Sequence, residues 1–202
     1  ACFSICSKLL LYFSVTWIFF CINFGNFWPL WIQIYYCLGT TVYNIYNLLA
    51  AYSLLKELGL SEDKIAKGLG TYTPTNGRMQ SISFANGSTV LLNLAKNPAG
   101  LNASLAIANS IKEEINYLLV LNDNGADGID ISWIWDTDFD ILLGQNINNI
   151  VCSGKRAKEL ALRLKYCGVN ANVVVNEDIP GAVAKLKSYN EKYAIAIPNY
   201  TA

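Results

Sequence analysis

The sequence predicts an α/β fold: a Rossmann-like, mostly parallel sheet with helices on both faces. Two observations predict it. Short aliphatic runs alternate with helical patterns through the second half of the chain, as in parallel strands joined by crossover helices. One hairpin signal, Ala85-Asn86-Gly87, precedes this alternation and predicts an antiparallel strand pair at its start.

Charge and hydropathy divide the chain near residue 40, so the expected domains are 1–40 and 41–202. Positions 9–55 carry no charged residue. The two apolar blocks in this leader, Leu9–Phe24 and Phe27–Leu38, each fall short of the ~20 residues that a membrane-spanning helix needs. Three interpretations stay open: a membrane anchor or signal-like segment, a buried piece of a larger domain, and a non-native leader.

Two helices are expected after the leader. Asn44–Leu58 has apolar residues at helical spacing and is followed by Gly59, a residue suited to a helix C-cap. Ser61 is placed to cap a second helix over Glu62–Leu69, whose first turn carries acidic residues as the helix dipole favours. A turn-rich connector over 70–77 follows.

The remaining elements are expected to alternate in type. Strands are predicted over Met79–Phe84, Thr89–Leu94, Tyr117–Leu121, Asn149–Cys152, Ala171–Val175 and Tyr193–Ile197. Helices are predicted over Ala99–Ile111, Thr137–Leu143, Lys155–Tyr166 and Ile179–Ser188.

Composition excludes several classes of function. The 15 basic and 15 acidic residues leave no electrostatic footprint for nucleic acid. The chain has no histidine, which excludes a self-contained Ser-His-Asp or Cys-His site and removes the commonest metal ligand. The six cysteines include no C-x-x-C, and Cys2 with Cys6 lacks a second pair at ligand spacing. We therefore expect reduced thiols and no metal site.

The stretch Asn122–Asp136 (NDNGADGIDISWIWD) concentrates acidic residues directly after a predicted buried strand. Open α/β sheets place ligands and catalytic groups at that end of a strand. We interpret Asp123 and Asp127 as turn residues, and Asp136 as a cap for the following helix. Asp130 is either another turn residue or the orienting carboxylate of a triad whose nucleophile and imidazole lie elsewhere.

Three further places could contact a nucleotide. Asn44 and Asn47, spaced i, i+3 on one helix, either cap it or bond a planar heterocycle such as adenine. Arg78 at a turn is either a solvated residue or a phosphate ligand. Lys96 opens a predicted helix, where it is a phosphate contact or a solvated loop residue. No G-x-x-x-x-G-K-[ST] loop occurs, so another domain would supply the main phosphate cradle.

Six stretches carry a resemblance to a known family: NIYNLLAA (44–51), NGRM (76–79), NLAKNPAG (93–100), NDNGADGIDISWIWD (122–136), SGKRAKELALRLKYCGV (153–169) and IPNYTA (197–202). In this order they resemble the C-terminal part of the Mur-ligase-like subunit (MurT) of lipid II isoglutaminyl synthase, from about Thr41 to Ala202. The resemblance implies a fold of the Mur ligase C-terminal domain type.

The resemblance also implies an enzyme subunit, part of an ATP-dependent carbon–nitrogen ligase of peptidoglycan synthesis that uses ATP and Mg²⁺. The ligase would activate the α-carboxyl of D-glutamate in the lipid II stem peptide as an acyl phosphate. A glutaminase subunit of the GatD type would supply ammonia, and the product would be D-isoglutamine. This work is done in the cytoplasm at the inner face of the bacterial membrane; whether the chain itself contacts the membrane stays open.

Residue by residue, the resemblance places Asn47, and more weakly Asn44, near the adenine. It places Arg78 and Lys96 near the ATP phosphates, and Asn97 belongs to the same nucleotide-binding motif as Lys96.

The resemblance matches Asp130 to the carboxylate that completes the glutaminase triad, whose Cys and His would come from the partner. Ile129 stands where the family usually has Arg, and Asn93 stands where many Mur ligases have a carboxylate. The family's phosphate-loop module and four-cysteine zinc ribbon do not occur in this sequence, so we expect this chain alone to lack synthetase activity. The alternative is a non-enzymatic module, membrane-tethered through 9–38, that binds a glutaminase.

Overall fold

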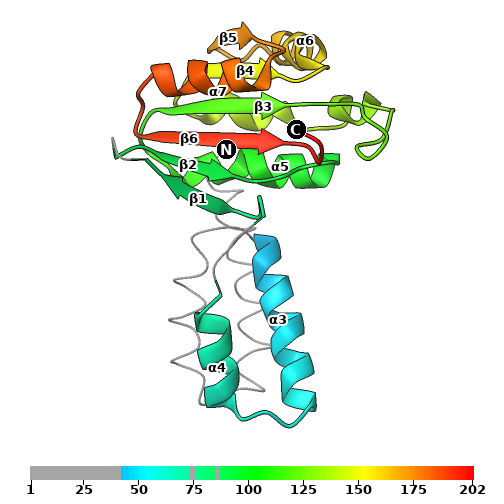
Figure 1. Ribbon diagram of the computed structural model, residues 1–202, viewed down its shortest axis with the longest axis vertical. Coiled ribbons are helices and arrows are strands. Elements are labelled where there is room, and N and C mark those ends of the chain that lie inside the picture. Colours follow the sequence, from blue (N-terminus) through cyan, green and yellow to red (C-terminus); the bar gives the residue numbers. More distant parts are fainter. Residues whose placement is uncertain (1–41, 73–75, 85–86) are drawn as a thin grey trace. The chain divides into compact units, whose positions relative to one another are not determined.

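The computed structural model describes residues 42–72, 76–84 and 87–202, which fall into two compact units divided after Tyr72 (Figure 1). The apolar leader, the Cys2 and Cys6 pair, and Ala85 and Asn86 of the hairpin link lie outside the described residues. Within the described part of the chain, no helix is both long and apolar enough to cross a membrane.

The first unit begins with helix α3, Val42–Glu57, which confirms the first predicted helix. The helix ends next to Gly59, as the sequence predicts. Gly59 has a φ of +79°, and its N–H donates to the Lys56 carbonyl at 2.9 Å, while the Leu60 N–H donates to the Leu55 carbonyl at 3.1 Å. This pair of bonds satisfies carbonyls that the helix end would otherwise leave without a partner.

Helix α4, Glu62–Gly70, confirms the second predicted helix. Ser61 occupies the N-cap position, but its side chain makes no capping hydrogen bond, so the predicted cap is wrong in that detail. Its backbone carbonyl instead accepts from the N–H groups of Lys64 and Ile65 at 3.1 Å. An ion pair between Lys56 and Glu62 links the two helices.

The second unit is built on one six-stranded sheet in the order β1-β2-β6-β3-β4-β5 (Figure 1). Its strands are β1 Gln80–Ser83, β2 Thr89–Leu92, β3 Ile115–Val120, β4 Ile147–Ser153, β5 Asn172–Val175 and β6 Tyr193–Pro198. Among these described strands, the β1–β2 pair is antiparallel and every other neighbouring pair is parallel. The predicted hairpin and the mostly parallel sheet are both confirmed.

The parallel strands β2 to β6 all end at one side of the sheet, which we call the carboxyl edge. The register fixes this alignment, because Val120 of β3 lies opposite both Pro198 of β6 and Ser153 of β4. Strand β1 runs the other way and therefore begins at the same edge. Segments far apart in the sequence thus meet there, as expected for an open α/β sheet.

Among the described residues of the second unit, three α-helices and three 3₁₀ segments accompany the sheet: α5 Pro98–Ala106, η1 Ile107–Ser110, η2 Ser132–Trp135, η3 Phe139–Gly144, α6 Ala157–Cys167 and α7 Ile179–Ser188. The helix predicted over Ala99–Ile111 is therefore α-helical only to Ala106. The helix predicted over Thr137–Leu143 is a 3₁₀ segment. Its buried residues Phe139 and Leu142 are three apart, which suits the three residues per turn of a 3₁₀ helix.

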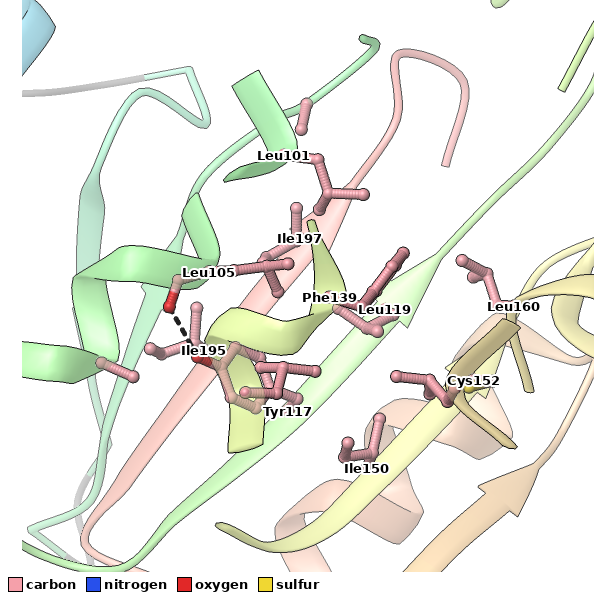
Figure 2. Packing of buried hydrophobic residues seen from close by; sticks show 14 of the residues in the cluster. Leu101, Leu105, Tyr117, Leu119, Phe139, Ile150, Cys152, Leu160, Ile195 and Ile197 are labelled. Atoms are coloured by element: carbon pink, nitrogen blue, oxygen red, sulfur yellow. Dashed lines mark hydrogen bonds between the residues drawn. The ribbon is translucent and has the colours of Figure 1, made fainter. Parts of the chain in front are cut away.

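Helices pack on both faces of the sheet, as predicted. On one face, Tyr117 and Leu119 of β3 and Ile195 of β6 pack with Leu105 of α5 and Leu160 of α6 (Figure 2). Each such fully buried apolar side chain contributes about 1.5–3 kcal/mol.

On the other face, Leu118, Val120 and Val151 of the strands pack against Ala182 and Leu186 of α7. The alternation of β3 residues between the two cores follows from the two-residue period of a strand.

Candidate functional site

Two asparagines tie together the chain segments that leave the centre of the carboxyl edge. Asn122 comes shortly after β3, and Asn199 directly follows β6. The Asn122 N–H donates to Asn199 Oδ1 at 3.1 Å, and Asn199 Nδ2 donates to the Asn122 carbonyl at 2.6 Å. Both residues are buried. The sequence patterns above do not predict this pair, although an asparagine follows both apolar runs, YLLVLN and AIAIPN.

Asn122 also holds the turn between β4 and α6. Its Oδ1 accepts from the Lys155 N–H at 3.0 Å. Gly154 has a φ of +84°, and a Cβ there would lie 2.6 Å from the Leu121 carbonyl oxygen. Only glycine fits this close approach, because a side chain would meet backbone that cannot move away. The loop after β3 and the start of α6 are therefore locked together.

Asp123 anchors the acidic loop, residues 122–136, to the start of α6. Its Oδ2 accepts from Nε and Nη2 of Arg156 at 2.9 and 2.6 Å, and Arg156 Nη1 donates to Glu159 at 2.9 Å. The hydrogen bond from the guanidinium holds the pKa of Asp123 below its ordinary value. The interpretation of Asp123 as a turn residue is wrong, because its carboxylate joins two segments.

Asp127 is a turn residue, as predicted, since its N–H donates to the Asn124 carbonyl at 2.8 Å. Its carboxylate has a second role. It accepts from the Thr201 N–H at 2.9 Å and from the Thr201 hydroxyl. The turn is thereby tied to the segment that follows β6.

Asp130 lies on the exposed part of the acidic loop. One of its oxygens accepts from the Ser132 N–H at 2.8 Å, and this bond, aided by the Ser132 side chain, lowers the pKa of Asp130. The group is therefore a carboxylate at neutral pH, able to accept a hydrogen bond from an incoming N–H. Neighbouring Ile129 is 77% exposed, so a carboxylate and an apolar side chain face solvent together.

Trp135, on the same loop, is 50% exposed. Its ring meets that of Tyr166 edge-on at 5.7 Å, and the Arg163 guanidinium carbon lies 5.5 Å from its centroid. Both contacts come from α6, and they hold the indole in place.

Asp136 does not cap the following helix. It ends η2, where its N–H donates to the Trp133 carbonyl at 3.1 Å. Asp138 is the residue before η3, and its side chain makes no capping bond either. The predicted cap is wrong because the next helical segment starts only at Phe139.

Arg78 and Lys96 lie on two segments that are bonded to each other at the carboxyl edge. The Leu94 N–H donates to the Gly77 carbonyl at 2.7 Å, and the Met79 N–H donates to Asn93 Oδ1 at 3.1 Å. Both basic side chains are exposed, and neither forms an ion pair within the described part of the chain. We call these two residues the cationic corner.

The backbone beside Arg78 is held in an uncommon shape. Met79 has a φ of +56°, rare for a residue other than glycine, and its side chain is buried. Asn93 accounts for this position, since it accepts from the Met79 N–H and its Nδ2 donates to Ser104 Oγ at 2.6 Å. Asn93 thus has a structural role in orienting the Arg78 turn.

Asn97 is the N-cap of α5. Its Oδ1 accepts from the Gly100 N–H at 2.8 Å, with Pro98 in the first turn as predicted. Lys96 directly precedes this helix start. The arrangement places a free lysine beside N–H groups and a dipole that both favour anions.

The two asparagines predicted near adenine belong to the first unit. Asn47 is exposed on α3. Asn44 is also within α3, and its side chain lies outside the described part of the structure. The other predicted site residues all belong to the second unit.

The described residues include no group of three His, Cys, Asp or Glu residues that could hold a metal ion. They also offer no activated thiol. Burial raises the pKa of Cys152 to about 12, and burial with the nearby Asp140 carboxylate raises that of Cys167 to about 11. Because the thiolate is the nucleophile, neither cysteine suits nucleophilic catalysis at neutral pH.

The profile of the family described as MurT ligase C-terminal matches residues 94–202. The MurT subunit of lipid II isoglutaminyl synthase (glutamine-hydrolyzing) from Staphylococcus aureus strain COL is 49% identical over 160 residues, 79% of this chain. The corresponding subunit from Streptococcus pneumoniae strain ATCC BAA-255 / R6 is 31% identical over 162 residues, 80% of this chain. The matched part spans only 36% of the length of each curated relative.

Solved structures agree on the fold. MurF from Acinetobacter baumannii superposes with a TM-score of 0.59 at 19% identity, over 78% of this chain and 35% of that one. The UDP-N-acetylmuramate-alanine ligase MurC from Thermotoga maritima superposes with a TM-score of 0.57 at 16% identity, over 79% of this chain and 34% of that one. The α/β arrangement is thus that of a Mur ligase C-terminal domain, and the chain belongs to the MurT ligase C-terminal family.

Proposed function

We propose that this chain is the C-terminal part of the Mur-ligase-like subunit of a lipid II isoglutaminyl synthase. In that assembly it contributes an orienting carboxylate to glutamine hydrolysis and phosphate contacts to ATP-dependent activation of the D-glutamate α-carboxyl. The work is done in the cytoplasm, at the inner face of the membrane that carries lipid II. The kinship with MurT subunits supports this assignment.

The observation that carries the glutaminase half of the proposal is the exposed carboxylate of Asp130. The chain has no histidine, and its described thiols are poor nucleophiles, so this carboxylate has no catalytic partner of its own here. A GatD-type glutaminase supplies Cys and His. Asp130 then accepts from the imidazole N–H, fixes its tautomer, and stabilises the imidazolium formed when the thiol is deprotonated.

The surface around Asp130 suits a protein partner. Exposed Ile129 and Trp135 flank the carboxylate along the chain, and Trp135 is held by two α6 side chains. Aromatic residues placed in this way are typical of the well-packed centres of interfaces. Burial by the partner excludes water and strengthens the hydrogen bond between Asp130 and imidazole.

The cationic corner supports the ligase half of the proposal. Arg78 and Lys96 are exposed, unpaired within the described residues, and adjacent to the start of α5. Guanidinium and ammonium groups there bind phosphate oxygens and stabilise the charge that develops as the γ-phosphoryl group is transferred. Asn47, with Asn44 as a weaker candidate, is proposed to contact the adenine, and Asn97 to support the phosphate contact as the cap of α5.

Arg78 and Lys96 fit ATP as contributors to its site, because both can contact phosphate groups. The chain has no G-x-x-x-x-G-K-[ST] loop, so it does not supply the main phosphate cradle. The chain does not offer a complete Mg²⁺ site, since the described residues include no cluster of metal ligands. The Asn93 side chain, where many Mur ligases have a carboxylate, is already hydrogen-bonded to Met79 and Ser104. Residues elsewhere in the assembly would hold that ion.

The test is Asp130→Asn in the complete two-subunit synthase. Asparagine keeps the shape but presents no carboxylate to the imidazole, so glutamine hydrolysis should fall on the order of 10³–10⁴-fold. Binding of the glutaminase, measured by calorimetry, should change little. Asp136→Asn is the control, because Asp136 is an exposed carboxylate of the same loop. Wild-type hydrolysis by Asp130→Asn would contradict the shared triad.

A further inference from the structure

Thr201 is bonded to three residues of the acidic loop. Its hydroxyl donates to Asp127 Oδ2 and accepts from Nδ2 of Asn124 at 2.7 Å and of Asn122 at 3.3 Å. A hydroxyl has one donor and two acceptor positions, so this one is fully used on the loop. The Thr201 N–H also donates to Asp127 Oδ1 at 2.9 Å, and its carbonyl accepts from Asn122 Nδ2 at 3.2 Å.

The sheet itself brings Thr201 to this place. The Asn199 N–H donates to the Val120 carbonyl at 3.1 Å, which extends the pairing of β6 with β3 past the end of the strand. The Ala202 N–H then donates to the Asn199 carbonyl at 3.3 Å and closes a turn that directs Thr201 toward the loop. The contact is therefore fixed by backbone pairing as well as by side chains.

Asp130 lies between two anchors of the acidic loop. On one side is the bond between Thr201 and Asp127, and on the other are Ile131 and Ile134, which pack into the core. Gly128, in between, has a φ of +90° and open space where a Cβ would be. Within the described part of the chain, no hydrogen bond or ion pair joins residues 128–131 to a residue outside the loop.

We propose that Thr201 is a positioning residue. Its hydrogen bonds to Asn122, Asn124 and Asp127 set where the Asp130 carboxylate meets the imidazole of the glutaminase. This inference rests on the proposed function. An orienting carboxylate must hold the imidazole within a narrow range of geometry, and a displacement of about 1 Å can cost on the order of 100-fold in rate. A loop interrupted by glycines requires an external anchor to reach that precision.

The experiment is Thr201→Val in the complete synthase with its glutaminase. Valine keeps the branched shape and the backbone bonds but removes the hydroxyl. We expect kcat for glutamine hydrolysis to fall about 10-fold to 100-fold, with KM for glutamine unchanged. Thr201→Ser should restore kcat, because it restores the hydroxyl. Amidation of lipid II with ammonium chloride as the nitrogen source should stay at the wild-type rate, because it bypasses hydrolysis.

Three outcomes would overturn the inference. Wild-type kcat in Thr201→Val, with Asp130→Asn inactive, would refute the positioning role and leave the proposed function standing. Equal loss of hydrolysis and ammonium-driven amidation would show that Thr201 serves folding alone. Normal hydrolysis by Asp130→Asn would remove the shared triad, and the positioning role with it.

Discussion

The acidic loop and the cationic corner both lie at the carboxyl edge, but they differ in whether their charged side chains have bonding partners within the fold. In the loop, Asp123 is paired with Arg156 and Asp127 is bonded to Thr201. In the corner, Arg78 and Lys96 have no ion-pair partner among the described residues. Two carboxylates of the loop have bonding partners elsewhere in the fold, whereas the two cationic side chains of the corner have no ion-pair partner among the described residues.

This difference separates two kinds of site. The bonds of the loop to Arg156 and Thr201 fix its backbone, and Asp130 is an exposed carboxylate of this loop whose position is set by the Ser132 N–H. In the corner, the bonds of Gly77 and Met79 fix only the backbone, and the cationic side chains are exposed. A rigid hydrogen-bond acceptor suits a triad, whereas long cationic side chains suit a phosphate group.

The largest effect on stability is expected at the junction that locks the acidic loop to α6. Gly154→Ala would place a Cβ 2.6 Å from the Leu121 carbonyl oxygen at a φ of +84°. We expect a loss of about 2–4 kcal/mol in the free energy of unfolding, measured by urea denaturation. Gly144→Ala is the control, because a Cβ there meets nothing within 4 Å. Equal stability of both variants would show that the junction is not locked.

A smaller effect, on activity alone, is expected in the cationic corner. Lys96→Ala and Arg78→Ala each remove one charge-assisted hydrogen bond to phosphate, so KM for ATP should rise about 10-fold to 100-fold. Glutamine hydrolysis should not change. Lys112→Ala is the control, because this exposed lysine precedes β3, at the opposite edge of the sheet. An unchanged KM for ATP in both corner variants would refute the phosphate contact.

The smallest effect is expected from the ion pair of Asp123 and Arg156. Because the folded-state pKa of Asp123 is lowered, its contribution to stability is present above the unfolded-state pKa of about 4 and is lost as pH falls through the folded-state pKa. Arg156→Gln should raise the pKa of Asp123 toward its ordinary value and reduce this acid-dependent loss.

Carboxyl carbon NMR titration would follow the pKa of Asp123, and unfolding measured below about pH 5 would follow stability. Lys158→Gln, which breaks the exposed pair with Glu177, should leave the titration of Asp123 unchanged. A pKa of Asp123 that does not move in Arg156→Gln would show that the guanidinium is not its cause.

Sequence patterns predicted the fold because its elements are encoded locally. Helix α7 begins and ends at the predicted residues, Ile179 and Ser188, where a proline after an acidic N-cap marks the start. The 3₁₀ segment at Phe139 was predicted as an ordinary helix, because short apolar runs do not distinguish a spacing of three residues from one of 3.6.

The candidate site was only partly predictable. Asp130, Arg78 and Lys96 stand out by residue type and place in the chain. The bonds that hold them do not, because Asn122 and Asn199 are 77 residues apart in the sequence, and only the strand order brings them together. The error at Asp123 has the same origin, since turn preferences do not show which charged group lies across the loop. The error at Asp136 is local, because the next helical segment starts only at Phe139.

The division of the carboxyl edge into two sites is tested most directly by measuring two rates in the same assembled synthase, glutamine hydrolysis and ammonium-driven amidation, for Asp130→Asn and Lys96→Ala. We predict reciprocal losses. Asp130→Asn should lose hydrolysis and keep ammonium-driven amidation, and Lys96→Ala should keep hydrolysis and lose amidation at limiting ATP. Parallel losses of both rates in both variants would contradict the division of the carboxyl edge into two sites.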